Sequence, residues 1–176
     1  MNRYRDEGFS LIELLMVVAL IGVLAAIATP ALLRARQSGN EAAAIGSLRA
    51  VTTAQSAYAA SCGNGYYSPS LTNLGIAPSG GTPFISADLS VADSVTKSGY
   101  TVTMGSSAGA VATAPASCNG LAAGVAVQGY NATATPAPGG GTRAFATNTK
   151  GTIFFLAGQV PPAVTDESTN IGTPIQ

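Results

Sequence analysis

Near its start the chain carries a long apolar segment that contains one carboxylate. No charged side chain occurs in residues 14–33, whereas Glu13 lies just inside the apolar region that opens at Phe9. As a helix, residues 14–33 would be about 30 Å long, which is enough to cross a bilayer. A charge at bilayer depth costs roughly 2.5–3.5 kcal/mol, so Glu13 indicates a partner and a function.

The residue before the apolar segment, Gly8, suggests what that partner is. A cut between Gly8 and Phe9 would create an α-ammonium group on Phe9, four residues before Glu13. Positions i and i+4 share one face of a helix, so the amine and the carboxylate could neutralise each other. This spacing alone also permits a pair within one chain.

Two simpler interpretations of the segment stay open. A secretory signal peptide has a short polar start and an apolar stretch, and Ala26-Ile27-Ala28 would serve as its cleavage site. Against it, Glu13 lies early in the apolar region and the helical pattern continues past Ala28. A plain single-span anchor explains the length of the segment but leaves Glu13 without a reason.

The segment resembles the N-terminal signature of type IV pilins and of the pseudopilins of type II secretion. The residues that carry the resemblance are GFSLIELL at positions 8–15 and VVALIGVLAAIATP at positions 17–30. The resemblance implies a leader at residues 1–8, cleavage between Gly8 and Phe9 by a prepilin peptidase, and N-methylation of Phe9. It further implies an assembly charge pair, in which Glu13 neutralises the amine of Phe9 in a neighbouring subunit.

Composition argues against most catalytic chemistry. Only 9% of the 176 residues are charged, the net charge is zero, and histidine is absent. The chain therefore lacks the commonest general base and metal ligand, and we predict no catalytic residue, cofactor or metal. Direct nucleic acid binding is not expected either, because it requires clustered Lys and Arg. Asp88 and Asp93 are interpreted as turn or capping residues, with a calcium site as the weaker alternative.

One long helix is predicted from about Phe9 to about Ala60, because this part is rich in Ala, Leu, Ile and Val. Its length would be roughly 75–80 Å, far more than a bilayer needs. We therefore divide it into a transmembrane or filament-core half, residues 9–33, and an outer half, residues 34–62.

Two positions interrupt the inner half of this helix. Pro30 removes one backbone hydrogen bond and clashes with the carbonyl of the preceding turn, which predicts a kink or an unwound turn. The family resemblance implies that the helix is loosened between Gly22 and Pro30, which would let a filament stretch.

The outer half has an apolar stripe at spacings of three and four residues, which can pack on a sheet. The members of this stripe are Ile45, Leu48, Val51, Gln55, Tyr58, Ala59 and Cys62. Charged residues are placed off the stripe, either on a solvated face or in contact with neighbouring subunits. They are Arg34, Arg36, Glu41 and Arg49.

Residues 63–176 are rich in Gly, Ser, Thr, Pro and Ala and are predicted to form a β-rich head. Short segments with β-forming residues predict strands at 99–104, 124–130, 143–147 and 152–156. Asn148-Thr149-Lys150-Gly151 predicts a hairpin turn. Residues 134–141 and the tail after Pro161 are expected to be disordered. The predicted fold class is α+β: a long helix whose outer half packs on a small antiparallel sheet of about four strands.

The two cysteines, Cys62 and Cys118, are predicted to form a structural disulfide. An exported head meets oxidising conditions, where paired cysteines usually bond. The closed loop of about 57 residues could stabilise the fold by roughly 4 kcal/mol. Two buried free thiols are the alternative. A redox role is disfavoured because the chain has no C-x-x-C pair.

By resemblance, the chain is expected to be a structural subunit of a type IV pilus that serves adhesion, surface motility or DNA uptake. It would cross the bacterial inner membrane once, N-terminus inside, before joining an extracellular filament of identical or homologous subunits. Its other partners would be the prepilin peptidase/methyltransferase and the pilus assembly platform. A pseudopilin in a periplasmic type II secretion filament is the alternative, and a monomeric membrane-anchored enzyme or binding module is a remote one.

Overall fold

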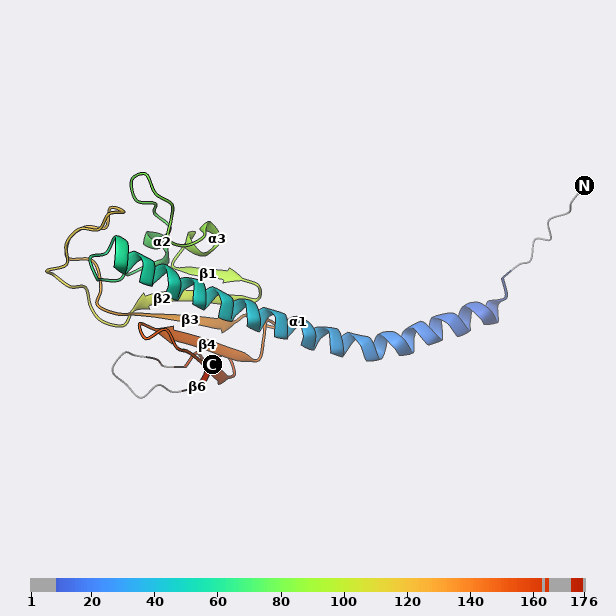
Figure 1. Cartoon of the computed structure of the whole chain (residues 1–176). Helices are drawn as coiled ribbons and strands as arrows, with labels where there is room; N and C mark the ends of the chain where they lie inside the picture. The colour runs from blue at the N-terminus through green and yellow to red at the C-terminus, as the bar shows by residue number, and fades with distance from the viewer. Residues whose placement is uncertain (1–8, 163, 165–171, 176) are drawn as a thin grey trace, which may run out of the picture. The chain divides into compact units, whose positions relative to one another are not determined.

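The computed structural model describes residues 9–162, 164 and 172–175 (Figure 1). The chain divides into two compact units, residues 1–36 and residues 37–176. Helix α1, Leu11–Ser61, contributes to both units. The single long helix predicted from the sequence is therefore confirmed, with its end within one or two residues of the expected position.

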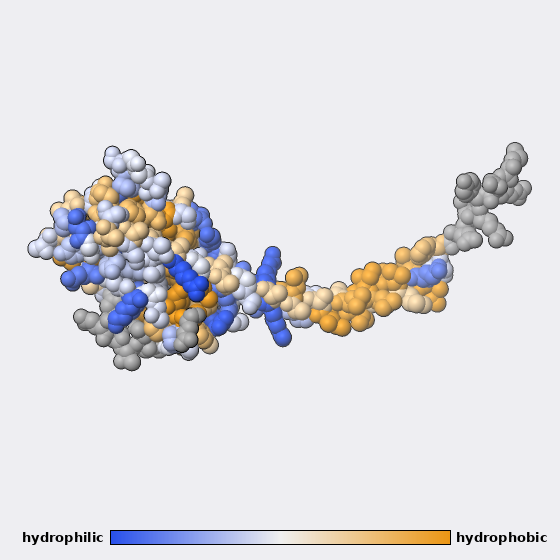
Figure 2. Space-filling model, in the orientation of Figure 1, coloured by the Kyte–Doolittle hydropathy of each residue, from blue (hydrophilic) through white to orange (hydrophobic). Residues whose placement is uncertain are grey.

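The first unit presents the apolar part of α1 without any protein cover. All residues from Phe9 to Arg36 are exposed in the single chain. Among the described residues, α1 is the one helix that is long and apolar enough, by length and composition, to cross a membrane. Figure 2 shows its apolar surface, with hydrophilic side chains at both ends of the apolar stretch. Such a continuous apolar surface requires lipid or protein to cover it.

The helix stays α-helical across the predicted interruptions at Gly22 and Pro30. Just before Pro30, the hydroxyl of Thr29 donates a hydrogen bond to the carbonyl of Ala25 at 2.8 Å. Because Pro30 has no backbone N–H, the carbonyl of Ala26 loses its helical donor, and the Thr29 bond, which goes to Ala25, does not replace it. The loosened segment that the resemblance implies for a filament therefore stays a prediction.

The second unit is built on a six-stranded antiparallel sheet in which each strand pairs with the next one along the chain. The strands are β1 (Ser94–Lys97), β2 (Tyr100–Ser106), β3 (Tyr130–Pro136), β4 (Arg143–Asn148), β5 (Ile153–Ala157) and β6 (Thr173–Ile175). Two short helices, α2 (Leu71–Leu74) and α3 (Ala87–Ser90), precede β1. The second half of α1 crosses one face of this sheet (Figure 1).

The helix and the sheet share one hydrophobic core. Leu48, Val51 and Tyr58 of α1 are fully buried, as is Gln55 beside them, and Cys62 is 4% exposed. The predicted inward stripe is therefore confirmed at these five positions. The sheet side is formed by alternate residues of β2 to β5, namely Tyr100, Val102, Met104, Tyr130, Ala132, Ala134, Phe145 and Ile153. This packing confirms the predicted α+β fold.

Three expectations about the strands are wrong. The sheet has six strands and not about four, because short polar or terminal segments such as β1 and β6 give little pattern. The strand expected at 124–130 lies instead at Tyr130–Pro136, where inward and outward residues alternate. Ala134 to Pro136, expected to be disordered, belong to this strand. The disorder expected for the tail is also wrong at Thr173–Ile175, which form β6, whereas residues 163, 165–171 and 176 lie outside the described residues.

The hairpin predicted between the last two segments is confirmed. Gly151 N donates to Asn148 O at 2.9 Å, and Lys150 N donates to Asn148 Oδ1 at 3.1 Å. Gly151 has a φ of 77°, a left-handed conformation that glycine adopts without strain. The turn joins β4 to β5, which pair antiparallel with Thr147 opposite Ile153.

Candidate functional site

The start of α1 is where the sequence places the candidate assembly site. Phe9 is 80% exposed. The carboxylate of Glu13 accepts a hydrogen bond from the backbone N of Ser10 at 3.1 Å. A glutamate three residues after a serine that starts a helix is half of a capping box, and a negative charge there also interacts favourably with the helix dipole. In the single chain, Glu13 therefore caps its own helix.

Sequence reasoning missed this capping role, although its signal is present as Ser10-Leu11-Ile12-Glu13. Gly8 lies outside the described residues. Cleavage between Gly8 and Phe9, methylation of Phe9 and the intersubunit pair of Phe9 with Glu13 all remain predictions.

Glu41 was predicted on the solvated or intersubunit face, and this expectation is wrong because the side chain is buried. Only 8% of the side chain is exposed. Its Oε1 accepts hydrogen bonds from the backbone N and the hydroxyl of Thr142, both at 3.0 Å. Its Oε2 accepts from Nε of Arg143 at 2.9 Å and from Nη2 of Arg143 at 2.5 Å. We call this arrangement of Glu41, Thr142 and Arg143 the Glu41 clamp; it ties α1 to the start of β4.

Neighbouring contacts reinforce the Glu41 clamp. Asn40 donates from Nδ2 to the carbonyl of Gly140 at 2.9 Å, and the hydroxyl of Tyr100 donates to the carbonyl of Arg143 at 2.7 Å. The guanidinium of Arg143 lies over the ring of Phe155, 5.1 Å from its centroid. The turn before β4 is thus fixed to α1 and to β2 by side chains on both.

Ionisation in the Glu41 clamp follows from these contacts. Burial raises the pKa of Glu41, but the hydrogen bonds from Arg143 and Thr142 outweigh burial and leave the pKa below its ordinary value of 4.5. Burial and the nearby Glu41 carboxylate raise the pKa of Tyr100 to about 12. At neutral pH the clamp therefore pairs an ionised glutamate with an arginine, and Tyr100 acts as a neutral donor.

A second polar contact lies deeper along α1. Gln55 is fully buried; its Nε2 donates to the carbonyl of Ser68 at 2.8 Å and its Oε1 accepts from Ser68 N at 2.9 Å. The side-chain amide thus pairs with the backbone of Ser68 as a neighbouring strand would. These two hydrogen bonds fix the position of the segment that follows α1.

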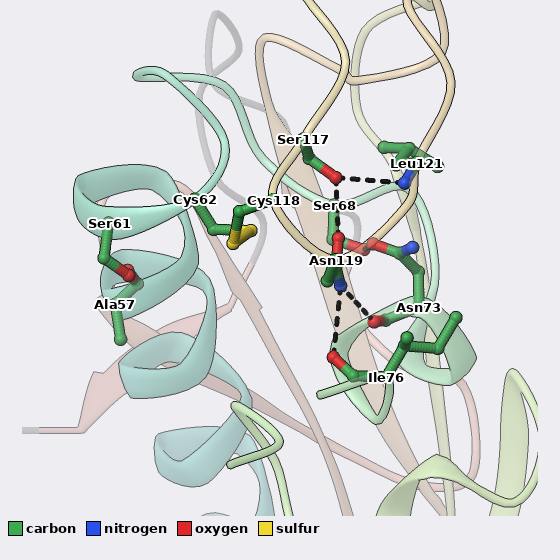
Figure 3. The surroundings of a disulfide bond; sticks show 10 residues. All are labelled: Ala57, Ser61, Cys62, Ser68, Asn73, Ile76, Ser117, Cys118, Asn119 and Leu121. Atoms are coloured by element: carbon green, nitrogen blue, oxygen red, sulfur yellow. Dashed lines mark hydrogen bonds between the residues drawn. A yellow bond between two sulfur atoms is a disulfide. The ribbon is translucent and has the colours of Figure 1, made fainter. Parts of the chain in front are cut away.

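The end of α1 is held covalently. Cys62 and Cys118 form a disulfide, which confirms the predicted bridge (Figure 3). Next to it, Asn119 Nδ2 donates to the carbonyl of Asn73 at 2.7 Å and to that of Ile76 at 3.3 Å (Figure 3). The bridge and the buried amide together fix the irregular segment between β2 and β3 against α1 and α2.

Asp88 and Asp93 have separate structural partners. Asp88 forms an exposed ion pair with Lys97. Asp93 accepts hydrogen bonds from the backbone N of Thr72 at 3.1 Å and from its hydroxyl at 2.9 Å. Over the described residues, no three His, Cys, Asp or Glu side chains gather as metal ligands would. Both acids are therefore used in local structure.

The exposed apolar start of α1, which Glu13 caps, leads into a disulfide-bonded α+β head. Residues 3–29 match the family model described as the prokaryotic N-terminal methylation motif. A curated relative, the type IV major pilin protein PilA of Myxococcus xanthus (strain DK1622), is 38% identical over 80 residues. That match covers 46% of this chain and 36% of the relative. No solved structure matches the chain. The motif and the relative support the type IV pilin family.

Proposed function

We propose that this chain is a structural subunit of a type IV pilus, held in the inner membrane by α1 before assembly and polymerised through the same helix. The observation that carries the proposal is the fully exposed apolar half of α1, most of which lies within the N-terminal methylation motif at residues 3–29. The relative, a type IV major pilin, supports a filament role over a catalytic one. Adhesion, surface motility or DNA uptake would be the roles of the finished filament.

The first step is removal of the leader. A prepilin peptidase/methyltransferase would cut between Gly8 and Phe9 and methylate the new amine. This creates a cation at the start of α1, where Glu13 now caps the helix through Ser10 N. With the N-terminus inside, residues 9–33 would span the membrane and the head would lie outside it.

Assembly then exchanges lipid for neighbouring helices. The exchange changes apolar burial little, so close packing and polar pairing must favour the filament. Small residues such as Gly22, Ala25 and Ala26 permit close approach of helices. Glu13 would exchange a hydrogen bond with a neutral backbone N–H for one with the ammonium of a neighbouring Phe9, and charge-assisted bonds are the stronger kind. The assembly platform would bring the two subunits together.

The processing step is tested on filaments sheared from cells. We expect mass spectrometry to show a chain that begins with methylated Phe9, whereas an uncut chain in purified filaments would contradict the proposal. Deleting the gene separates the two filament types: loss of surface filaments indicates a pilus, and loss of secreted proteins with normal pili indicates a type II pseudopilus.

The charge pair needs variants that separate ionisation from capping. Glu13→Gln keeps an oxygen that can accept from Ser10 N and removes the charge. We expect both Glu13→Gln and Glu13→Ala to be cleaved normally and to yield no filaments. Normal assembly of Glu13→Gln would show that capping, and not the ion pair, is what the filament requires.

A further inference from the structure

The outer end of the apolar stretch carries two arginines whose role the filament model does not explain. Arg34 and Arg36 follow directly on the uncharged residues 14–33, and both are exposed. Neither forms an ion pair with any residue that the structure describes, where the pairs are Lys97 with Asp88 and Arg143 with Glu41. Two guanidinium groups are thus available at one level of the helix.

Their directions around the helix differ. Residues two apart are rotated by about 200° on an α-helix, so Arg34 and Arg36 project from nearly opposite sides. Figure 2 shows hydrophilic side chains on both sides of the helix at this end of the apolar stretch. The two guanidinium groups can therefore contact partners on opposite sides of the helix.

Arg36 also lines a shallow hollow on the helix surface. Thr29, Leu32 and Leu33 form the rest of its wall, and its volume is about 270 Å³. The hollow therefore combines apolar side chains on the membrane side with a hydroxyl and a guanidinium. This arrangement complements a phospholipid, in which apolar acyl chains lie next to a phosphate that a guanidinium can bind.

The distance along α1 matches the thickness of a bilayer. Glu13 and Arg34 are 21 positions apart, which corresponds to about 31 Å of helix, and the hydrocarbon core of a bilayer is about 30 Å thick. When Glu13 lies at the inner boundary of this core, Arg34 and Arg36 lie at the outer one. This places both guanidinium groups at the level of the lipid phosphates.

The positive charges of Arg34 and Arg36 favour an anionic partner. With the N-terminus inside, these arginines lie on the outer side of the membrane, against the usual excess of positive charge inside. A guanidinium binds phosphate through two parallel hydrogen bonds and stays charged at any physiological pH. We propose that Arg34 and Arg36 bind lipid headgroup phosphates in the outer leaflet and hold the unassembled subunit at one depth. This inference rests on the membrane-anchored state in the proposed function.

The contact is tested directly by solid-state NMR on the full chain in vesicles of phosphatidylethanolamine and phosphatidylglycerol, in a ratio of about three to one. Arginine is labelled with ¹³C at Cζ, and dephasing by ³¹P is measured in a buffer without inorganic phosphate, so that every phosphorus belongs to lipid. Two of the chain's six arginines are removed in Arg34→Gln/Arg36→Gln. We expect the total dephasing to fall by a third or more.

Arg49→Gln is the matched control, because Arg49 is also an exposed arginine of α1 but lies beyond the apolar stretch. We expect it to leave the dephasing unchanged. Wild-type dephasing in the double variant, or an equal loss in Arg49→Gln, would overturn the inference. The single variants Arg34→Gln and Arg36→Gln, checked for helix content and co-sedimentation with vesicles, should each lose part of the signal.

Filament yield is measured separately on the same variants in cells. Filaments from a wild-type chain whose arginines show no dephasing by lipid phosphorus would overturn this inference and leave the proposed function standing. Dephasing in a wild-type chain that forms no filaments would contradict the proposed function and leave the lipid contact standing.

Discussion

Replacing Glu41 with glutamine should loosen the attachment of the head to α1 at one end. Glu41→Gln keeps the size of the side chain and removes its charge. One oxygen can still accept from Thr142, but the new amide group would point its own donors at the donors of Arg143. Both bonds from the guanidinium, at 2.9 and 2.5 Å, are then lost.

The size of the effect follows from burial on the two sides of the pair. Breaking a fully buried ion pair costs about 3–5 kcal/mol, because it leaves a buried charge alone. Here the Glu41 side chain is 8% exposed, but that of Arg143 is 41% exposed and can regain water. We therefore expect a loss of about 2 kcal/mol in the free energy of unfolding, in the range for hydrogen bonds to charged groups.

The assay is urea unfolding of the full chain in detergent micelles at pH 7, with the disulfide intact. Urea is preferred to guanidinium because a salt would screen the pair under test. Tyrosine circular dichroism reports the packing of the head, since the chain has six Tyr and no Trp. Asp88→Asn is the matched control: it breaks the exposed pair with Lys97 and should leave the unfolding midpoint almost unchanged.

The pH dependence of the unfolding stability gives a second test of Glu41→Gln. The pKa of Glu41 is lowered in the folded state, so the stabilisation from its ionised form is present above pH 4.5 and is lost as the pH falls through the folded value. The difference between wild type and Glu41→Gln should therefore shrink as the pH is lowered below 4.5. Equal midpoints at pH 7 would refute the role of the pair, and a difference that persists in strong acid would refute its ionic origin.

Three further changes test the remaining contacts of the head by urea unfolding. Gln55→Leu should lower the free energy of unfolding by about 1–3 kcal/mol, because the backbone of Ser68 loses two buried partners; an unchanged midpoint would argue against this pairing. Asn119→Asp should destabilise more than Asn119→Ala, because its carboxylate would face two carbonyl oxygens, and the opposite order would contradict the assigned donor. Reduction of the Cys62–Cys118 disulfide should lower the free energy of unfolding by about 2–5 kcal/mol. Unfolding is compared with and without a thiol reductant, and equal midpoints would show that the disulfide does not stabilise the head.

The parts of the fold that could be predicted from the sequence are those that local pattern determines. Spacings of three and four placed Leu48, Val51, Gln55 and Tyr58 on the buried face of α1, and all four are fully buried. The bridge between Cys62 and the only other cysteine followed from its exported surroundings.

Glu41 shows that the buried stripe extends further toward the N-terminus of α1 than its apolar residues alone predict. Counting back from Leu48 by four and three residues gives Ala44 and Glu41, so the carboxylate lies on the stripe and not beside it. Its charge argued for a solvated position, but its partners Thr142 and Arg143 are about a hundred residues away in the sequence. No local rule reveals such a pair.

The predicted position of β3 is wrong for a different reason. Residues 124–130 contain β-forming side chains, yet Val127 makes only isolated bridges to Tyr67 and Ala110. The true strand begins at the buried Tyr130, then alternates the small buried Ala132 and Ala134 with half-buried polar residues and ends at Pro136. Small residues have low β-propensity, but they fit where α1 packs closely on the sheet. Tertiary packing therefore outweighs propensity at this strand.

The contacts along α1 form a graded attachment of the head. The Glu41 clamp lies at the start of the buried stripe, the Gln55 contact lies further along, and the disulfide at Cys62 ends it. A polar clamp can open and re-form, whereas the disulfide cannot open without a reductant. If the Glu41 clamp opened, the head would therefore stay attached to α1 through the Gln55 contact and the disulfide.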